Sequence, residues 1–221
     1  MVKFKYDSNQ EIEEVLWHFS DYADFKKQGY DIILPKISVG LKKKLISGAT
    51  DKVTIDEFKA GFSKIFSSES LVYKKTKDEV EQNWRKIETE FFNTVSDLFP
   101  NKKNTYTCYL SRYGPGGAYF PPTSISARVI WEKKSELKEA NEKIAHELIH
   151  LFIYKKAEVS KLCFEDIERL VDLILSKTPI ANLLHNPKMQ GMGDKRLDDF
   201  FVSNSFNLDK TLRNYRGQNR I

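Results

Sequence analysis

The spacing of apolar residues predicts that most of the first hundred residues are helical. Apolar positions recur three or four residues apart behind two Ser/Thr-x-x-Glu capping boxes, which begin at Ser8 and Thr54. A further short helix is predicted within residues 35–46, and residues 70–99 have the pattern of a long amphipathic helix. This region contains no chemical motif, so we predict that it supports or controls the rest of the chain.

The pattern changes after a cluster of helix-breaking residues at 100–104. Residues 105–113 and 124–131 are rich in β-branched and aromatic side chains, which predicts two strands. The glycine-rich residues 114–117 lie between them. These glycines form either a plain turn or a place where a substrate backbone approaches a strand edge.

Helical periodicity returns over residues 134–157, 164–177 and 195–212. We therefore predict an α+β fold that is mostly helical and contains a small antiparallel sheet. The chain is expected to divide into a helical N-terminal region, 1–100, and a second part, 101–221, that carries the chemistry. The two parts could form one compact unit.

The composition is that of an ordinary globular protein and changes this picture little. Of the 221 residues, 40% are hydrophobic and 30% are charged, which excludes wholesale disorder. No apolar run approaches the roughly 18 residues of a membrane span, and the N-terminus has no signal-peptide pattern. We therefore expect a cytoplasmic protein without a membrane partner. Cys108 and Cys163 have no metal-binding spacing and are predicted to be free, buried thiols.

The net charge of +5 comes mostly from lysine pairs that are scattered along the chain. The one concentrated basic stretch is the C-terminus, with Lys210, Arg213, Arg216 and Arg220. Such a stretch could contact nucleic acid or an acidic partner, but we expect a solvated or frayed tail. Nucleic acid is therefore not predicted as a partner.

The most informative motif is His146-Glu147-Leu148-Ile149-His150, an H-E-x-x-H sequence. Side chains four residues apart share one helix face, so both imidazoles can reach a single zinc ion. Glu147 is then close enough to deprotonate a water molecule without being a ligand. Residues 144–153 are otherwise apolar, which indicates a buried helix in which a cation would satisfy these ionisable groups. The alternative is a chance match on a helix whose histidines pair by hydrogen bonds.

A catalytic zinc site normally has a third protein ligand, and the motif does not continue to a third histidine after His150. The next predicted helix carries four acids. Advancing 100° per residue puts Glu168 at the margin of its apolar face, with Asp172 one turn later, while Glu165 and Asp166 point farther into solvent. Glu168 is therefore the acid that is best placed to face inward. The alternative is that Glu168 is a solvated helix acid.

Glu168 and Asp172 form an E-x-x-x-D pattern, and with H-E-x-x-H this resembles the gluzincin branch of the zinc metallopeptidases. The resemblance covers residues 146–172 and suggests a small, minimal member. It implies a zincin-like fold, with the small sheet packed beside the H-E-x-x-H helix. It also implies that Glu168 completes a site for one Zn²⁺ ion, and that Asp172 accepts a hydrogen bond from the outer nitrogen of His146.

His185 follows the second of these helices and has three possible roles. It could return over the site and stabilise the oxyanion of a tetrahedral intermediate. It could instead be the third metal ligand, or a loop histidine with neither role.

These features together predict a zinc-dependent metallopeptidase. In this reading, Glu147 takes a proton from zinc-bound water, the hydroxide attacks a polarised peptide carbonyl, and Glu147 passes the proton to the leaving amine. An edge strand within residues 105–131 would hold a peptide or protein substrate in extended form.

Two alternatives remain open at this stage. One is a non-catalytic, zinc-supported binding or regulatory module, in which a fourth protein ligand closes the site. The other is a zinc hydrolase of a small amide, similar to a deformylase, in which Cys108 could take part.

Overall fold

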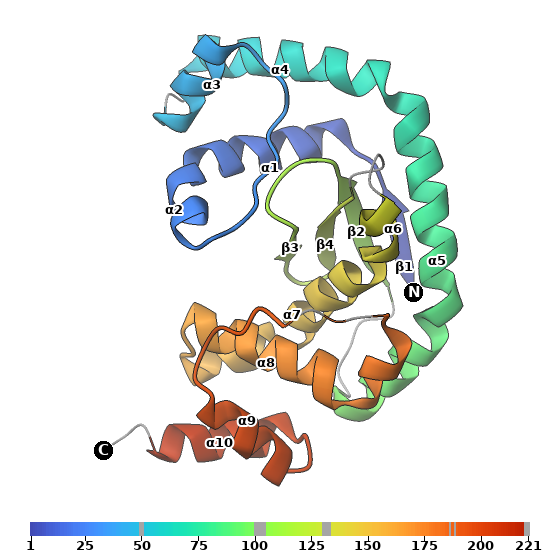
Figure 1. The fold of residues 1–221 in the computed structure, drawn as a ribbon, viewed down its shortest axis with the longest axis vertical. Coiled ribbons are helices and arrows are strands. Elements are labelled where there is room, and N and C mark those ends of the chain that lie inside the picture. Colours follow the sequence, from blue (N-terminus) through green and yellow to red (C-terminus); the bar gives the residue numbers. More distant parts are fainter. Residues whose placement is uncertain (49–50, 100–104, 130–133, 186, 188, 219–221) are drawn as a thin grey trace.

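The computed structural model describes residues 1–48, 51–99, 105–129, 134–185, 187 and 189–218. Figure 1 shows the long helix α5 running along one side of the molecule, from helices α1 to α4 at one end towards α7 and α8 at the other. A small sheet lies between these two groups of helices. The architecture is thus α+β and mostly helical, as predicted.

Helices dominate the N-terminal region. They are α1 (Ser8–Ser20), α2 (Tyr22–Lys27), α3 (Val39–Ile46), α4 (Lys52–Ser68) and α5 (Ser70–Leu98). The predicted capping residues were wrong: Asp7 caps α1 and Asp51 caps α4, because their carboxylates accept backbone N–H groups of the first turn. Helix α2 and a short strand, β1 (Val2–Lys5), were not predicted.

The sheet has four strands in the order β1-β2-β4-β3, with β2 at Tyr106–Ser111, β3 at Gly117–Phe120 and β4 at Ser124–Arg128. Strand β2 pairs in parallel with both β1 and β4, and only β3 and β4 are antiparallel. The prediction of an antiparallel sheet was therefore wrong. The reason is that β3 occupies the segment between the two predicted strands and lies outside β4, so that β4 runs in the same direction as β2.

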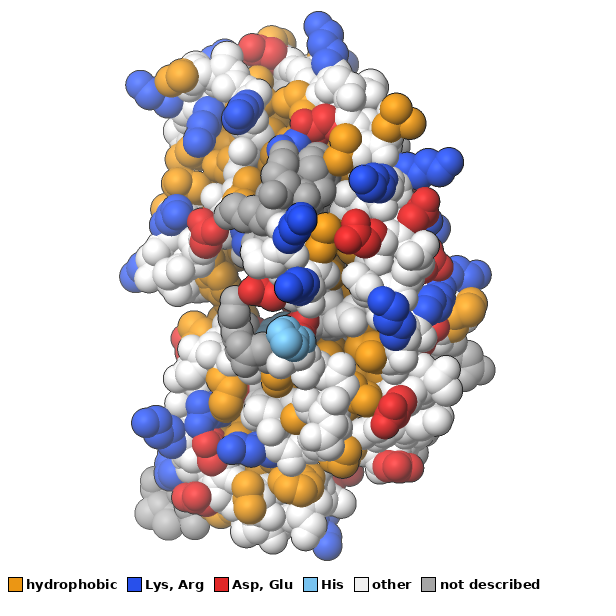
Figure 2. All heavy atoms as spheres, turned by 45° about the vertical axis from the view of Figure 1, so that its right-hand side comes forward, with side chains coloured by type: hydrophobic (Ala, Val, Ile, Leu, Met, Phe, Trp, Pro, Cys, Tyr) orange, Lys and Arg blue, Asp and Glu red, His pale blue; other side chains and the backbone are white. Residues whose placement is uncertain are grey.

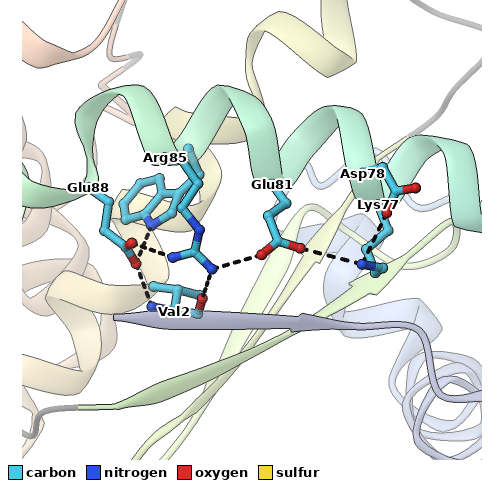
Figure 3. Close-up of polar contacts among 7 residues, drawn as sticks. Val2, Lys77, Asp78, Glu81, Arg85 and Glu88 are labelled. Carbon is cyan, nitrogen blue, oxygen red and sulfur yellow. Dashed lines mark hydrogen bonds and ion pairs between the residues drawn. The ribbon is translucent and has the colours of Figure 1, made fainter.

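Figure 3 shows how α5 holds β1 in the sheet. The backbone N–H of Val2 donates to Glu88 Oε1 (2.5 Å), and the Arg85 guanidinium donates to the Val2 carbonyl (2.9 Å). Arg85 also forms ion pairs with Glu81 and Glu88. The buried Trp84 indole donates to the same Glu88 oxygen (3.2 Å). The N-terminal region is thus fastened to the sheet that packs on the H-E-x-x-H helix.

The C-terminal part contains α6 (Lys134–Lys138), α7 (Ala140–Ser160), α8 (Phe164–Lys177), the 3₁₀ helix η1 (Pro179–Leu183), α9 (Arg196–Ser203) and α10 (Leu208–Gln218). Helix α7 packs against β3, β4 and α8. The main core gathers apolar side chains from the sheet, α5, α7 and α8, and a second core lies among α1, α3 and α4. The predicted helical stretch 195–212 is two helices joined at Asn204–Asn207.

Basic side chains are distributed over the face in Figure 2 rather than gathered in one patch. The basic C-terminal segment forms α10, so the expectation of a frayed tail was wrong for this part. The expectation of a solvated segment is confirmed for Lys210 and Arg213, which are exposed, and Arg220 lies outside the described residues. Arg216 donates to the carbonyls of Val159 and Ser160 at the end of α7. A cation at a helix C-terminus is favourable because the helix dipole is negative there.

Two further predictions concern the cysteines and membrane-spanning helices. Cys108 is buried, but Cys163 is exposed, so the prediction of two buried thiols was wrong for Cys163. It lies at the start of α8, outside the packed face of that helix. No helix in the described part of the chain is both long enough and apolar enough to cross a membrane.

Candidate metal centre

The turn between α7 and α8 brings the two motif helices together. Helix α7 ends at Ser160, the left-handed backbone of its C-cap residue Lys161 (φ 51°) reverses the chain, and α8 begins at Phe164. The two helices then pack side by side. His146 and His150 lie on the face of α7 that meets Glu168 of α8.

The three predicted ligands meet at one point. The Nε2 atoms of His146 and His150 are 3.1 Å apart, and each lies 3.2 Å from a carboxylate oxygen of Glu168. One potential ligand atom from each residue lies within 4.8 Å of the others. Such a group could hold a metal ion. His150 and Glu168 are 2% and 4% exposed, so the prediction that Glu168 faces inward is confirmed.

The charges of the three residues are strongly coupled. Burial raises the pKa of Glu168, but hydrogen bonds from His146 and His150 outweigh it and hold the pKa at about 2. Burial lowers the pKa of His146, yet the hydrogen bond to Glu168 and the nearby carboxylates raise it overall. The pKa of His150 stays lowered because burial dominates there. The Glu168 carboxylate is therefore ionised, and a cation bound here would compete with a proton for the His146 imidazole.

Glu147 lies beside this group without joining it. Its side chain is 7% exposed and borders the same cavity as the two histidines. Burial raises the pKa of Glu147 to about 8, against the lowering effect of His146. A methyl group on Gly117 of β3 would lie only 2.5 Å from Glu147 Oε1, so the strand backbone approaches this carboxyl closely.

Strand β3 covers the centre from one side. The ring of Tyr119 stacks on the ring of His150, with centroids 4.5 Å apart and planes 3° apart. All four residues of β3 border the cavity, and β3 is an edge strand. A plain turn was the simpler expectation for the glycine-rich residues 114–117. The structure differs from it, because strand β3 begins at Gly117.

The cavity has a volume of about 610 Å³ and extends from His146, His150 and Glu168 to the N-terminal helices. Trp17, Phe25 and Tyr30 line it on the side of these helices. Their rings make a continuous series, with 5.4 Å between Trp17 and Phe25 and 5.8 Å between Phe25 and Tyr30. No sequence pattern indicated chemistry in this region, because its aromatic spacing is equally typical of a helix core.

Asp172 is buried but does not form the hydrogen bond with His146 that the resemblance implied. Its Oδ2 accepts the backbone N–H groups of Gln190 (2.7 Å) and Gly191 (3.2 Å). Its Oδ1 and His150 Nδ1 have no hydrogen-bond partner in the described structure. Asp172 therefore fixes the backbone at Gln190 and Gly191.

His185 lies outside the group of three potential ligands, and its side chain does not line the cavity. Its backbone N–H donates to Glu142 (2.8 Å). The same segment instead brings Gln190 to the centre, which no sequence pattern indicated. The Gln190 amide nitrogen donates to Glu168 (2.9 Å) and lies 3.4 Å from His146 Nε2.

Asp166 is 8% exposed rather than solvated, so its predicted position was wrong. Its carboxylate accepts the Tyr215 hydroxyl (2.7 Å) and the Asp194 backbone N–H (3.0 Å). The loop before α9 and helix α10 cover this side of α8, which helix periodicity alone does not reveal. Glu165 is exposed, as predicted.

The chain was compared with known proteins at three levels. No protein-family model, no curated protein and no solved structure matches it.

Proposed function

We propose that the protein is a zinc-dependent, zincin-like metallopeptidase in which His146, His150 and Glu168 hold one Zn²⁺ ion. The observation that carries this proposal is the convergence of the three side chains, with separations of 3.1 to 3.2 Å between facing atoms. Ligands bound to zinc at 2.0–2.1 Å in tetrahedral geometry lie about 3.3 Å from one another. Two imidazoles and one carboxylate also form a known ligand set of catalytic zinc sites.

A zinc ion held there would polarise a carbonyl group and lower the pKa of a water molecule. Glu147 is the proton carrier in this scheme. It takes a proton from the attacking water as the new C–O bond forms, and it gives that proton to the amine nitrogen as the C–N bond breaks. Its position beside the ligands, open to the cavity, supports this role.

A peptide is the substrate that the cavity suits best. Strand β3 is an edge strand that borders the cavity over its whole length, so its outer edge is available to an extended chain. An extended peptide binds such an edge through backbone hydrogen bonds. The aromatic wall of Trp17, Phe25 and Tyr30 would contact its side chains.

The alternatives of a closed zinc module and a small-amide hydrolase receive less support. In the described part of the chain, the group of potential ligands contains three residues, which leaves a position for water. Cys108 is fully buried in β2 and is not among the three.

Hydrolysis of a peptide library by the zinc-loaded protein tests the proposal, with the Glu147→Gln variant alongside. We expect Glu147→Gln to keep one zinc ion, because the ligands are untouched, and to lose turnover by orders of magnitude. Glu165→Gln, an exposed acid on α8, is the matched control and is expected to behave as wild type. Equal turnover by zinc-loaded wild type and Glu147→Gln would contradict the mechanism.

A further inference from the structure

Residues 190–194, which precede α9, are fastened to α8 beside the proposed ligand Glu168. Asp172, one turn beyond Glu168, accepts the backbone N–H groups of Gln190 and Gly191. Asp166, on the preceding turn, accepts the N–H of Asp194. Gly193 has a positive φ of 79°, and a methyl group there would lie 2.4 Å from the Glu165 carbonyl, so the segment lies close against the helix. The position of Gln190 is therefore set by α8.

The side-chain amide of Gln190 is oriented by its acceptor. A carboxylate can only accept hydrogen bonds, so the group 2.9 Å from Glu168 Oε2 is the Nε2 amino group. This group has two N–H bonds, and Glu168 accepts one of them. The same nitrogen lies 3.4 Å from His146 Nε2. When the lone pair of His146 Nε2 is used to hold a metal ion, that atom can no longer accept the second N–H.

Peptide hydrolysis places negative charge on the carbonyl oxygen of the bond that is cleaved. A fixed N–H donor aimed at that oxygen stabilises the transition state more than the ground state. The sequence suggested His185 for this role, but its side chain does not line the cavity. Gln190 does line it, beside Glu168 and His146, five residues after His185.

We propose that Gln190 is a catalytic residue, whose side-chain amide donates a hydrogen bond to the carbonyl oxygen of the scissile peptide bond. The proposal rests on the proposed peptidase function. It assigns a neutral amide donor, held by Asp172 and Glu168, to the position where a histidine was expected. Asp172 is then a positioning residue, because it fixes the backbone that carries Gln190.

The test compares Gln190→Met, which keeps the length of the side chain and removes the donor, with His185→Ala as a control on the same segment. Zinc content, kcat and KM are measured on a peptide that wild type cleaves. The affinity of each zinc-loaded protein for a phosphonamidate peptide, a tetrahedral analogue of the reaction, is measured by calorimetry. Tyr30→Phe is included because the Tyr30 hydroxyl is another donor on the cavity wall.

We expect Gln190→Met to lower kcat by about 10²-fold, the typical effect of removing one oxyanion donor, with KM and zinc content unchanged. Phosphonamidate binding should weaken by a similar factor, while His185→Ala should match wild type. Unchanged kcat or unchanged phosphonamidate affinity in Gln190→Met would overturn the proposal, as would a loss seen only in Tyr30→Phe. A wild-type protein that cleaves no peptide would instead reject the peptidase function, and the role of Gln190 with it.

Discussion

Gly117 of β3 and Glu147 of α7 are in direct contact: a methyl group at Gly117 would lie 2.5 Å from Glu147 Oε1 and 2.9 Å from its Cγ. Real Cβ atoms essentially never approach another atom so closely, so a side chain at this position displaces the glutamate. The strand edge proposed to bind substrate and the proposed proton carrier thus meet at one residue.

Gly117→Ala is expected to move the Glu147 carboxyl and to lower turnover by at least about 10-fold, because small displacements of a catalytic group are costly. Zinc content should not change, since none of the three ligands is touched. Gly116→Ala is the matched control, because nothing lies within 4 Å of a methyl group there. Equal kcat values for the two variants would show that Glu147 adjusts without loss of function.

The three proposed zinc ligands should differ sharply from their neighbours in metal binding. His146→Ala and His150→Ala are expected to abolish stoichiometric zinc, and Glu168→Ala to weaken it by at least about 10-fold, because each removes one of three protein ligands. Glu165→Ala, three residues earlier on the exposed side of α8, should bind zinc as wild type does. Elemental analysis and competition with a chelator measure this. A full complement of tightly bound zinc in Glu168→Ala would remove Glu168 from the ligand set.

A buried glutamate far from the ligands gives a pH-dependent prediction. Burial raises the pKa of Glu11 from 4.5 to about 7, although hydrogen bonds from the Arg112 backbone, Ser111 and Tyr73 lower it. Between pH 4.5 and 7 the unfolded chain has lost this proton and the folded protein still holds it. Proton binding therefore stabilises the folded state below pH 4.5, and this contribution is lost as the pH rises to 7.

Glu11→Gln removes this titration. The free energy of unfolding of wild type, relative to Glu11→Gln, is expected to fall by roughly 3 kcal/mol between pH 4.5 and 7.5. Urea unfolding at a series of pH values measures the difference. The exposed Glu13→Gln on the same helix should show no such trend. A difference that stays constant or grows with pH would contradict the assignment.

Glu88 holds β1 to α5, so its removal should destabilise the protein. Glu88→Ala leaves the buried Trp84 indole N–H and the Val2 backbone N–H without their acceptor. Each unsatisfied buried donor costs about 1–3 kcal/mol, and because two donors are affected we expect a loss of stability of at least that size. Thermal or urea unfolding measures it. Glu90→Ala, at an exposed position of α5, should stay within about 0.5 kcal/mol of wild type. Similar stabilities for the two variants would show that Glu88 does not hold the strand.

The sequence by itself determined the elements that depend on local periodicity. The helix predicted at 164–177 is α8, and the long helix predicted at 70–99 is α5. The convergence of His146, His150 and Glu168 was also predictable, because helix geometry fixes which side chains share a face and a short turn joins the two helices.

Contacts between distant segments were decided only by the tertiary structure. Val2 pairs with Tyr106 across the sheet, and Tyr215 buries Asp166 from 49 residues away. The hydrogen bond from the Gln190 backbone N–H to Asp172 is another contact between distant segments. It places the side-chain amide of Gln190, and not the His185 imidazole, beside Glu168. Local patterns show which face of a single helix or strand is apolar. Which faces meet depends on the burial of apolar surface by the whole chain, and no local pattern records it.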